Sequence, residues 1–152
     1  MSISFLTRSR SSIIMLIAAV LAVIPGAEIG CSSPPPQISL EGQYAVLSPL
    51  FIGAGSVFLT IRNSGGRDEL VGASIGLPNT VIELHDVRDN RMVRVEKIAV
   101  PSRGSAELTP AGRHIMIFNM PKTVKEGSEI TVTLRFERSG EKSMPVRFRK
   151  EY

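Results

Sequence analysis

EITVTLRF, residues Glu129–Phe136, alternates strictly between polar and apolar side chains. Successive side chains of a β-strand point to opposite faces, so this stretch would turn an apolar face toward a core and a polar face toward water. SVFLTIRN, residues Ser56–Asn63, likewise places Val57, Leu59 and Ile61 on one face. Two such segments in one chain indicate a fold built from β-strands.

Further short stretches along the chain have the same character. They are Leu70–Ser74, Thr80–His85, Arg91–Val95, Ser105–Leu108, His114–Phe118 and Met144–Phe148. Clusters of Gly, Pro, Ser and Asn separate these stretches, as turns require. No segment after residue 31 keeps helical spacing of apolar residues long enough to predict a helix. The sequence therefore predicts an all-β sandwich or barrel in a single domain, residues 40–152.

The first thirty residues have the character of an export signal. Arg8 and Arg10 precede Ile13–Ile24, an uncharged apolar run of twelve residues. Spanning a membrane takes about 20 apolar residues, so this run has the length of a signal peptide, predicted as residues 1–30. Export places the domain outside the cytoplasm, in the periplasm or on the outer face of the cell membrane.

Cys31, the only cysteine of the chain, directly follows this segment. Its position resembles the lipobox of bacterial lipoproteins, with Glu28 where a Leu or small apolar residue is usual. We therefore expect a lipid on Cys31 that anchors the chain to a membrane. Ordinary cleavage nearby and an uncleaved N-terminal anchor are the alternatives. Residues 31–39, with three consecutive prolines, are predicted to be a stiff tether.

Charge and composition exclude several classes of function. Loss of residues 1–30 would remove Arg8, Arg10 and Glu28 from 18 Lys+Arg and 14 Asp+Glu, which leaves a net charge of only +3. With no Trp and two Tyr, the chain also lacks a row of aromatic rings, so no nucleic-acid partner is expected. The domain has no thiol, no nucleophile–base pair and no Gly-rich phosphate loop, and we predict that it is not an enzyme.

Two histidines and two methionines are spaced so that β-strands bring them together. His114 and Met116 are two residues apart in a predicted strand, so they share a face. His85 ends another predicted strand, and Met92 lies on the strand that returns after the turn. Because Glu83 shares a face with His85 and is not expected to be buried, His85 is predicted to point toward solvent.

The chemistry of these four side chains favours monovalent copper. Thioether sulfur is soft and uncharged, so it suits Cu(I), and imidazole binds copper in either oxidation state. A blue-copper electron-transfer centre needs a cysteine thiolate, and Cys31 lies outside the domain. The expected task is therefore to hold and pass on copper. Met120 and Met144 are interpreted as ordinary core residues.

At these residues the chain resembles the PCuAC family of extracytoplasmic copper chaperones. The family pattern is a His, a Met about ten residues later, and then His-x-Met after a gap of twenty-one residues. Twenty-one residues separate Met92 from His114, whereas only six separate His85 from Met92. The resemblance implies a cupredoxin-like Greek-key β-sandwich and Cu(I) bound by His85, Met92, His114 and Met116. It also implies delivery to the copper A centre of a respiratory oxidase.

Three functions remain open at this point. The first is a copper chaperone with a surface His₂Met₂ site and an extracytoplasmic copper-accepting protein as its partner. The second is a copper buffer or resistance protein with the same site and no specific acceptor. The third is a lipoprotein interaction module whose metal site is vestigial, which the short spacing between His85 and Met92 favours. In each case we expect a membrane-anchored monomer.

Overall fold

The computed structural model describes residues 33–150, and the predicted signal peptide and Cys31 lie outside this range. The described residues belong to one compact unit, Ser32–Tyr152. Its elements are β1 (Ile38–Leu47), β2 (Gly55–Asn63), β3 (Asp68–Ile75), β4 (Val81–Arg88), β5 (Arg91–Val95), β6 (Ile98–Val100), β7 (Gly104–Leu108), β8 (His114–Phe118), β9 (Glu129–Phe136) and β10 (Gly140–Arg149). Residues 33–150 contain no helix, and therefore no helix long and apolar enough to cross a membrane. The expected all-β fold is confirmed.

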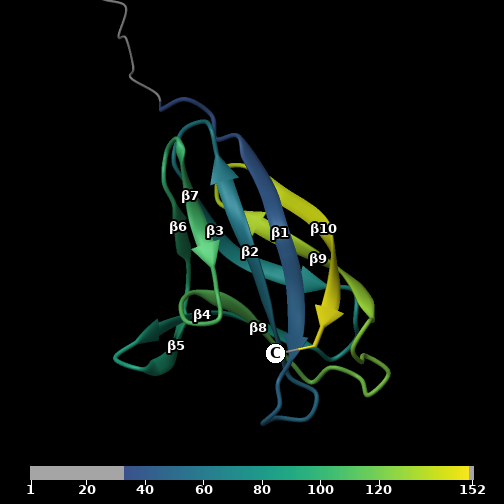
Figure 1. The fold of residues 1–152 in the computed structure, drawn as a ribbon. Helices are drawn as coiled ribbons and strands as arrows, with labels where there is room; N and C mark the ends of the chain where they lie inside the picture. The colour runs from purple at the N-terminus through teal and green to yellow at the C-terminus, as the bar shows by residue number, and fades with distance from the viewer. Residues whose placement is uncertain (1–32, 151–152) are drawn as a thin grey trace, which may run out of the picture. The chain divides into compact units, whose positions relative to one another are not determined.

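The strands form one strongly curved, nearly closed sheet (Figure 1). Their order is β5-β4-β8-β2-β1-β10-β9-β3-β6, and β7 pairs with β2 beyond the end of β8. All pairs are antiparallel except β1 and β10, which run parallel. Because β2 pairs with β8 near Ser56 and with β7 near Asn63, it links the two ends of the barrel.

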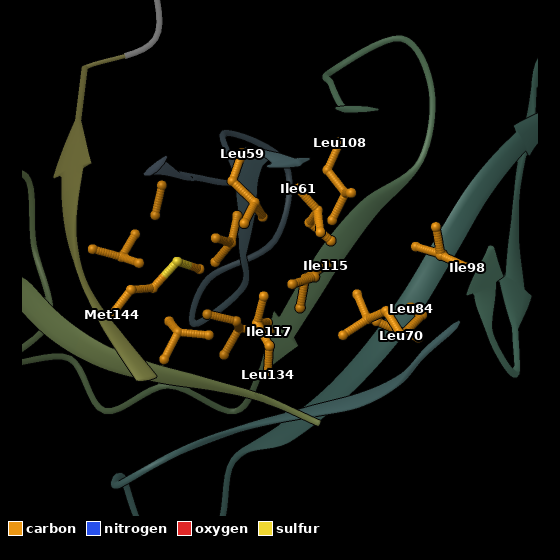
Figure 2. Packing of buried hydrophobic residues seen from close by; sticks show 14 of the residues in the cluster. Leu59, Ile61, Leu70, Leu84, Ile98, Leu108, Ile115, Ile117, Leu134 and Met144 are labelled. Carbon is orange, nitrogen blue, oxygen red and sulfur yellow. The ribbon is translucent and has the colours of Figure 1, made fainter. Parts of the chain in front are cut away.

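Alternate residues of the strands fill the interior (Figure 2). On β2 these are Val57, Leu59 and Ile61, and on β9 they are Val132, Leu134 and Phe136, as the alternation of each segment predicts. Met120 and Met144 are also buried in this cluster, which confirms their interpretation as core residues. Burial of this apolar surface is the main force that holds the barrel together.

Three predicted strands, at 91–95, 114–118 and 129–136, have the predicted bounds, and the others differ at their ends. The largest difference is β10, which begins at Gly140, four residues before its predicted start, while β4 was predicted to end at His85 and continues to Arg88. The turn predicted over 86–90 is in fact a two-residue turn at Asp89 and Asn90, whose φ angles are 50° and 59°. Such left-handed residues are typical of tight β-hairpins, and Asn and Asp tolerate them well.

Two strands had not been predicted. β6 is only three residues long, and β1 begins at Ile38, so the predicted boundary at residue 40 falls inside β1. A register shift between Glu41 and Tyr44, with Gly42 at a φ of 64°, interrupts β1. This bulge breaks the alternation by which a strand is recognised in a sequence.

The proline-rich residues before β1 bind to the turn that follows β2. The backbone N–H of Gly66 donates to the carbonyl of Pro35 (3.1 Å), and that of Ser64 donates to the carbonyl of Gln37 (3.0 Å). The Arg138 guanidinium donates to the carbonyls of Ser33 and Pro34. Residues 33–37 are therefore docked on the domain, at the Asn63 end of β2.

Candidate metal site

Adjacent strands bring the predicted ligands to one outward face of the barrel. In the β4–β8 ladder His85 lies opposite His114 and Glu83 lies opposite Met116. In the β2–β8 ladder Ser56 lies opposite Met116. The alternate residues of β8, Ile115 and Ile117, point into the core and fix which face the ligands occupy.

One pocket of about 330 Å³ is lined by all four predicted ligands, His85, Met92, His114 and Met116. Aromatic side chains of β2 and β8, Phe58 and Phe118, form part of its wall. The rest comes mainly from the segment that leaves β1, Val46–Phe51. The structure therefore gathers the four side chains at one place, beneath a loop that is remote from them in the sequence.

The hydrogen bond of His114 determines which of its ring nitrogens is free to bind a metal ion. Its side chain is buried, and Nδ1 lies 2.8 Å from the carbonyl oxygen of Gly112. A carbonyl oxygen only accepts, so Nδ1 carries the proton and donates it, and the neutral ring keeps a free lone pair on Nε2. The ring of Phe58 lies beside it, with centroids 6.1 Å apart.

His85 presents the other kind of nitrogen. Its Nε2 lies 2.9 Å from a carboxylate oxygen of Glu83, which only accepts, so Nε2 carries the proton. The lone pair is then on Nδ1, which is buried and has no hydrogen-bond partner. A buried acceptor without a partner is costly, and a metal ion bound there would remove that cost.

The prediction that His85 points to solvent is wrong. Its side chain is only 13% exposed and that of Glu83 only 22%. Glu83 is tolerated there because its second oxygen lies 3.2 Å from the guanidinium of Arg94, while the first accepts from His85. A carboxylate with two such partners can be partly buried at little cost.

The two methionines differ in exposure. Met116 is buried, and its sulfur accepts a hydrogen bond from the hydroxyl of Ser56 at 3.0 Å, which helps to hold the thioether in place. Met92 is 60% exposed and lies opposite Val87 in the β4–β5 hairpin. Since Val87 is two residues from His85, Met92 shares the face of His85.

The short spacing between His85 and Met92 is compatible with this arrangement. The family pattern has about four more residues there, which corresponds to two residues on each strand. Removing an even number of residues per strand keeps every side chain on its original face. The tight turn at Asp89 and Asn90 closes the shortened hairpin without breaking its ladder.

The donor set consists of two imidazole nitrogens and two thioether sulfurs. The ring centroids of His85 and His114 are 5.8 Å apart, close enough for one ion to bind a nitrogen of each at about 2 Å. Within residues 33–150, no three His, Cys, Asp or Glu side chains gather as a metal site, so the candidate site depends on its methionines. Such a neutral, soft donor set suits Cu(I) better than Zn²⁺ or Ca²⁺.

Sequence reasoning did not identify Glu83 and Ser56 as parts of the site. Glu83 was treated as a solvent-exposed charge, although its place two residues before His85 puts both side chains on one face. Ser56 contacts Met116 only through the pairing of β2 with β8, and that register is not visible in the sequence. The covering loop at 48–51 was missed for the same reason.

Comparisons with known proteins show which proteins the chain is similar to. Residues 38–147 match a family model described as "Putative lipoprotein LpqE-like". The chain is 26% identical over 89 residues to "Putative lipoprotein Lxx21020" of Leifsonia xyli subsp. xyli, a match that spans 55% of this chain and 54% of that protein. The match thus spans about half the length of that relative.

Solved structures with similar folds include copper-binding domains. A copper-bound PCuAC domain from PmoF2 matches with a TM-score of 0.62 and 20% identity, covering 75% of this chain and 93% of that one. The solution structure of CuI-DR1885 from Deinococcus radiodurans matches with a TM-score of 0.62 and 21% identity, covering 83% and 86%. These likenesses confirm that the domain has the expected PCuAC fold.

Proposed function

Because the chain belongs to the LpqE-like family and its domain has the PCuAC fold, we propose that it is a copper chaperone. It binds one Cu(I) through His85, Met92, His114 and Met116 and passes the ion to an acceptor outside the cytoplasm. The copper A centre of a respiratory oxidase is the acceptor that its resemblance to PCuAC proteins favours. The chain acts as a carrier, not as an enzyme.

The observation that carries the proposal is the convergence of these four side chains on one pocket. Its most telling detail is Nδ1 of His85, a buried nitrogen without a hydrogen-bond partner. Glu83 holds the proton on the opposite ring nitrogen, so Nδ1 is ready to bind a metal ion without first losing a proton. His114 is prepared in the same way by the carbonyl of Gly112.

The difference in exposure between Met92 and Met116 favours the transfer of copper to an acceptor. Three of the ligands sit in the buried part of the site, while Met92 lies at its exposed edge. An incoming ligand from an acceptor can replace the Met92 sulfur first and then draw the ion away from the remaining three. A neutral donor set assists this exchange, because no anionic ligand is left uncompensated when the copper departs.

The cellular place of the protein is part of the same proposal. The family description names a lipoprotein, and Cys31 follows a segment of signal-peptide character. We therefore place the domain outside the cytoplasm, attached to a membrane by a lipid on Cys31, as a monomer. A copper buffer with the same ligands is the second candidate, favoured by the deep burial of His114 and Met116.

The test is a titration of the soluble domain, residues 32–152, with Cu(I) against a competing chelator. We expect tight binding of one ion, and at least about a tenfold loss of affinity (1.4 kcal/mol) in Met116→Leu. Met144→Leu is the matched control, since it removes the sulfur of another buried methionine, one that does not line the pocket. Equal affinities in both variants would exclude Met116 as a ligand.

A copper-transfer experiment distinguishes a chaperone from a buffer. The Cu(I)-loaded domain is mixed with the soluble copper A domain of an oxidase subunit from the same organism, and copper is followed by its absorption in the acceptor. Rapid and complete transfer is expected of a chaperone. Retention of the copper by the loaded domain would support the buffer instead.

A further inference from the structure

Large exposed apolar side chains surround the metal pocket. Those that the structure identifies within residues 33–150 are Leu50 (82% exposed), Phe51 (61%), Ile52 (96%), Val81 (45%) and Met92 (60%). Leu50, Phe51 and Met92 line the pocket, Ile52 follows them in the same loop, and Val81 pairs with Phe118 of the pocket wall. Apolar side chains gathered at one place on a surface are typical of an interaction site.

The loop that carries three of these residues has a defined conformation. The hydroxyl of Ser48 accepts hydrogen bonds from the backbone N–H groups of Leu50 and Phe51. The backbone of Ala54 closes the loop through bonds with Ser48 (2.9 Å) and Phe51 (3.2 Å). Gly53 in turn accepts from Met120 at 2.8 Å. A surface held in this way loses less conformational entropy when a partner docks on it.

One positive charge lies beside this apolar surface, and two more lie at the tip of the neighbouring hairpin, on the face opposite to that of Met92. Arg88 and Arg91 are direct cross-strand partners at this tip, and both are exposed. Like charges in such a position repel each other, and only Arg88 has a carboxylate partner, Asp86, among the ion pairs of the described residues. Lys122 lies beside Phe51 and Ile52 in a second, adjoining pocket. A carboxylate on a partner that covers Phe51 and Ile52 would pair with Lys122.

The position of the docked proline segment argues against a membrane as the partner. Residues 33–37 bind at the Asn63 end of β2, whereas the metal pocket lies at the Ser56 end. Seven residues of strand separate the two ends, roughly 23 Å at 3.3 Å per residue. A lipid on Cys31 would be joined to Ser33 by at most about 7 Å of chain. The chain therefore enters the domain at the end of β2 that is remote from the metal pocket.

We propose that the apolar rim, Leu50–Ile52 with Met92, together with Lys122, is the docking surface for the protein that receives copper. The partner presents an apolar patch flanked by a carboxylate. This inference rests on the proposed chaperone function. Contact at the rim brings the acceptor's ligands to Met92, the exposed edge of the site, while the surrounding apolar contacts exclude water during the exchange.

The experiment measures the rate of copper transfer from the Cu(I)-loaded domain to the soluble copper A domain of an oxidase subunit. The variant is Ile52→Ser with Lys122→Glu, two exposed residues that do not line the metal pocket. Arg67→Glu, an exposed charge reversal at the opposite end of the domain, is the control. Transfer to a small chelator is measured in parallel, because a chelator needs no docking surface.

We expect the variant to bind Cu(I) as tightly as the wild type and to release it to the chelator at the same rate. Its second-order rate of transfer to the copper A domain should fall by at least about tenfold. The wild-type rate should decrease with rising salt, and the Arg67→Glu rate should not differ from it.

Other outcomes overturn the inference in distinguishable ways. Equal transfer rates in variant and wild type refute the docking surface and leave the chaperone function standing. Copper binding without any transfer to the copper A domain refutes this partner and the docking surface together. Co-flotation of the domain with anionic vesicles, or a dimer that Ile52→Ser dissociates, assigns the rim to another occupant. Failure to bind Cu(I) refutes the proposed function itself.

Discussion

His85 and His114 are direct cross-strand partners in the β4–β8 ladder, and their ring centroids lie 5.8 Å apart. The backbone fixes the positions of the two rings, and a neighbouring oxygen fixes the tautomer of each ring. The carboxylate of Glu83 holds the proton of His85 on Nε2, and the carbonyl of Gly112 holds that of His114 on Nδ1. The lone pair is therefore on Nδ1 in one ring and on Nε2 in the other, and both rings line the same pocket.

The first prediction concerns Glu83. Glu83→Gln weakens the interaction that holds the proton on Nε2 of His85, so Cu(I) affinity should fall by about ten- to a hundredfold. Nitrogen NMR of the copper-free domain should show His85 as the Nε2–H tautomer in the wild type and as a mixture in the variant. Glu107→Gln, an exposed carboxylate on β7, is the control and should change neither property.

The second prediction tests the geometry of the shortened hairpin. Met92→Ala should weaken Cu(I) binding, and adding Val87→Met should restore part of the affinity. Val87 lies opposite Met92 on the same face, so a thioether placed there points to the same side. Val93→Met in the Met92→Ala background is the control, because residue 93 faces the other way. Equal rescue by both variants would contradict the register.

Much of the fold, and the gathering of the four proposed ligands at one pocket, could be predicted from the sequence. The strict alternation in Glu129–Phe136 identified a core strand, and the spacing of His114 and Met116 put both on one face. β1 could not be predicted, because its bulge interrupts the alternation. The roles of Glu83, Ser56 and the loop at 48–51 depend on which strands pair and in what register. Strand pairing and register are determined only when segments that are distant in the sequence come together in the fold.

The third prediction concerns acid stability. Burial alone would raise the pKa of Asp68. Hydrogen bonds from the Ser139 hydroxyl and from the backbone N–H groups of Arg138, Glu69 and Ser139 outweigh it and lower the pKa below its ordinary value of 3.8. The ionised Asp68 therefore stabilises the fold fully above about pH 4. This stabilisation is lost as the pH falls through the lowered pKa of Asp68 in the folded state.

This effect is measured by urea unfolding of the domain at pH 7, 4 and 3, with Asp68→Asn as the variant. At pH 7 the variant should be less stable by roughly 1–3 kcal/mol, because it cannot satisfy the same donors. The difference between the two proteins should shrink at pH 3. A difference that stays constant with pH would show that Asp68 stabilises the fold without its charge.

The fourth prediction concerns the docked proline segment. A Cβ at residue 66 would overlap the Pro34 carbonyl oxygen, so Gly66→Ala should displace residues 33–36 from the domain. The amide of residue 66, which donates to Pro35, should then exchange its hydrogen faster. Gly76→Ala is the control, since nothing lies within 4 Å of its Cβ position. Cu(I) affinity should be the same in both, because the pocket lies at the other end of β2.

The central claim is that one copper ion is held by two imidazoles and two thioethers. X-ray absorption spectroscopy of the Cu(I)-loaded domain, residues 32–152, tests it most directly. We predict a first coordination shell of two nitrogen and two sulfur atoms, and the loss of one sulfur in Met116→Leu but not in Met144→Leu. A shell without sulfur, or one unchanged in Met116→Leu, would contradict the account.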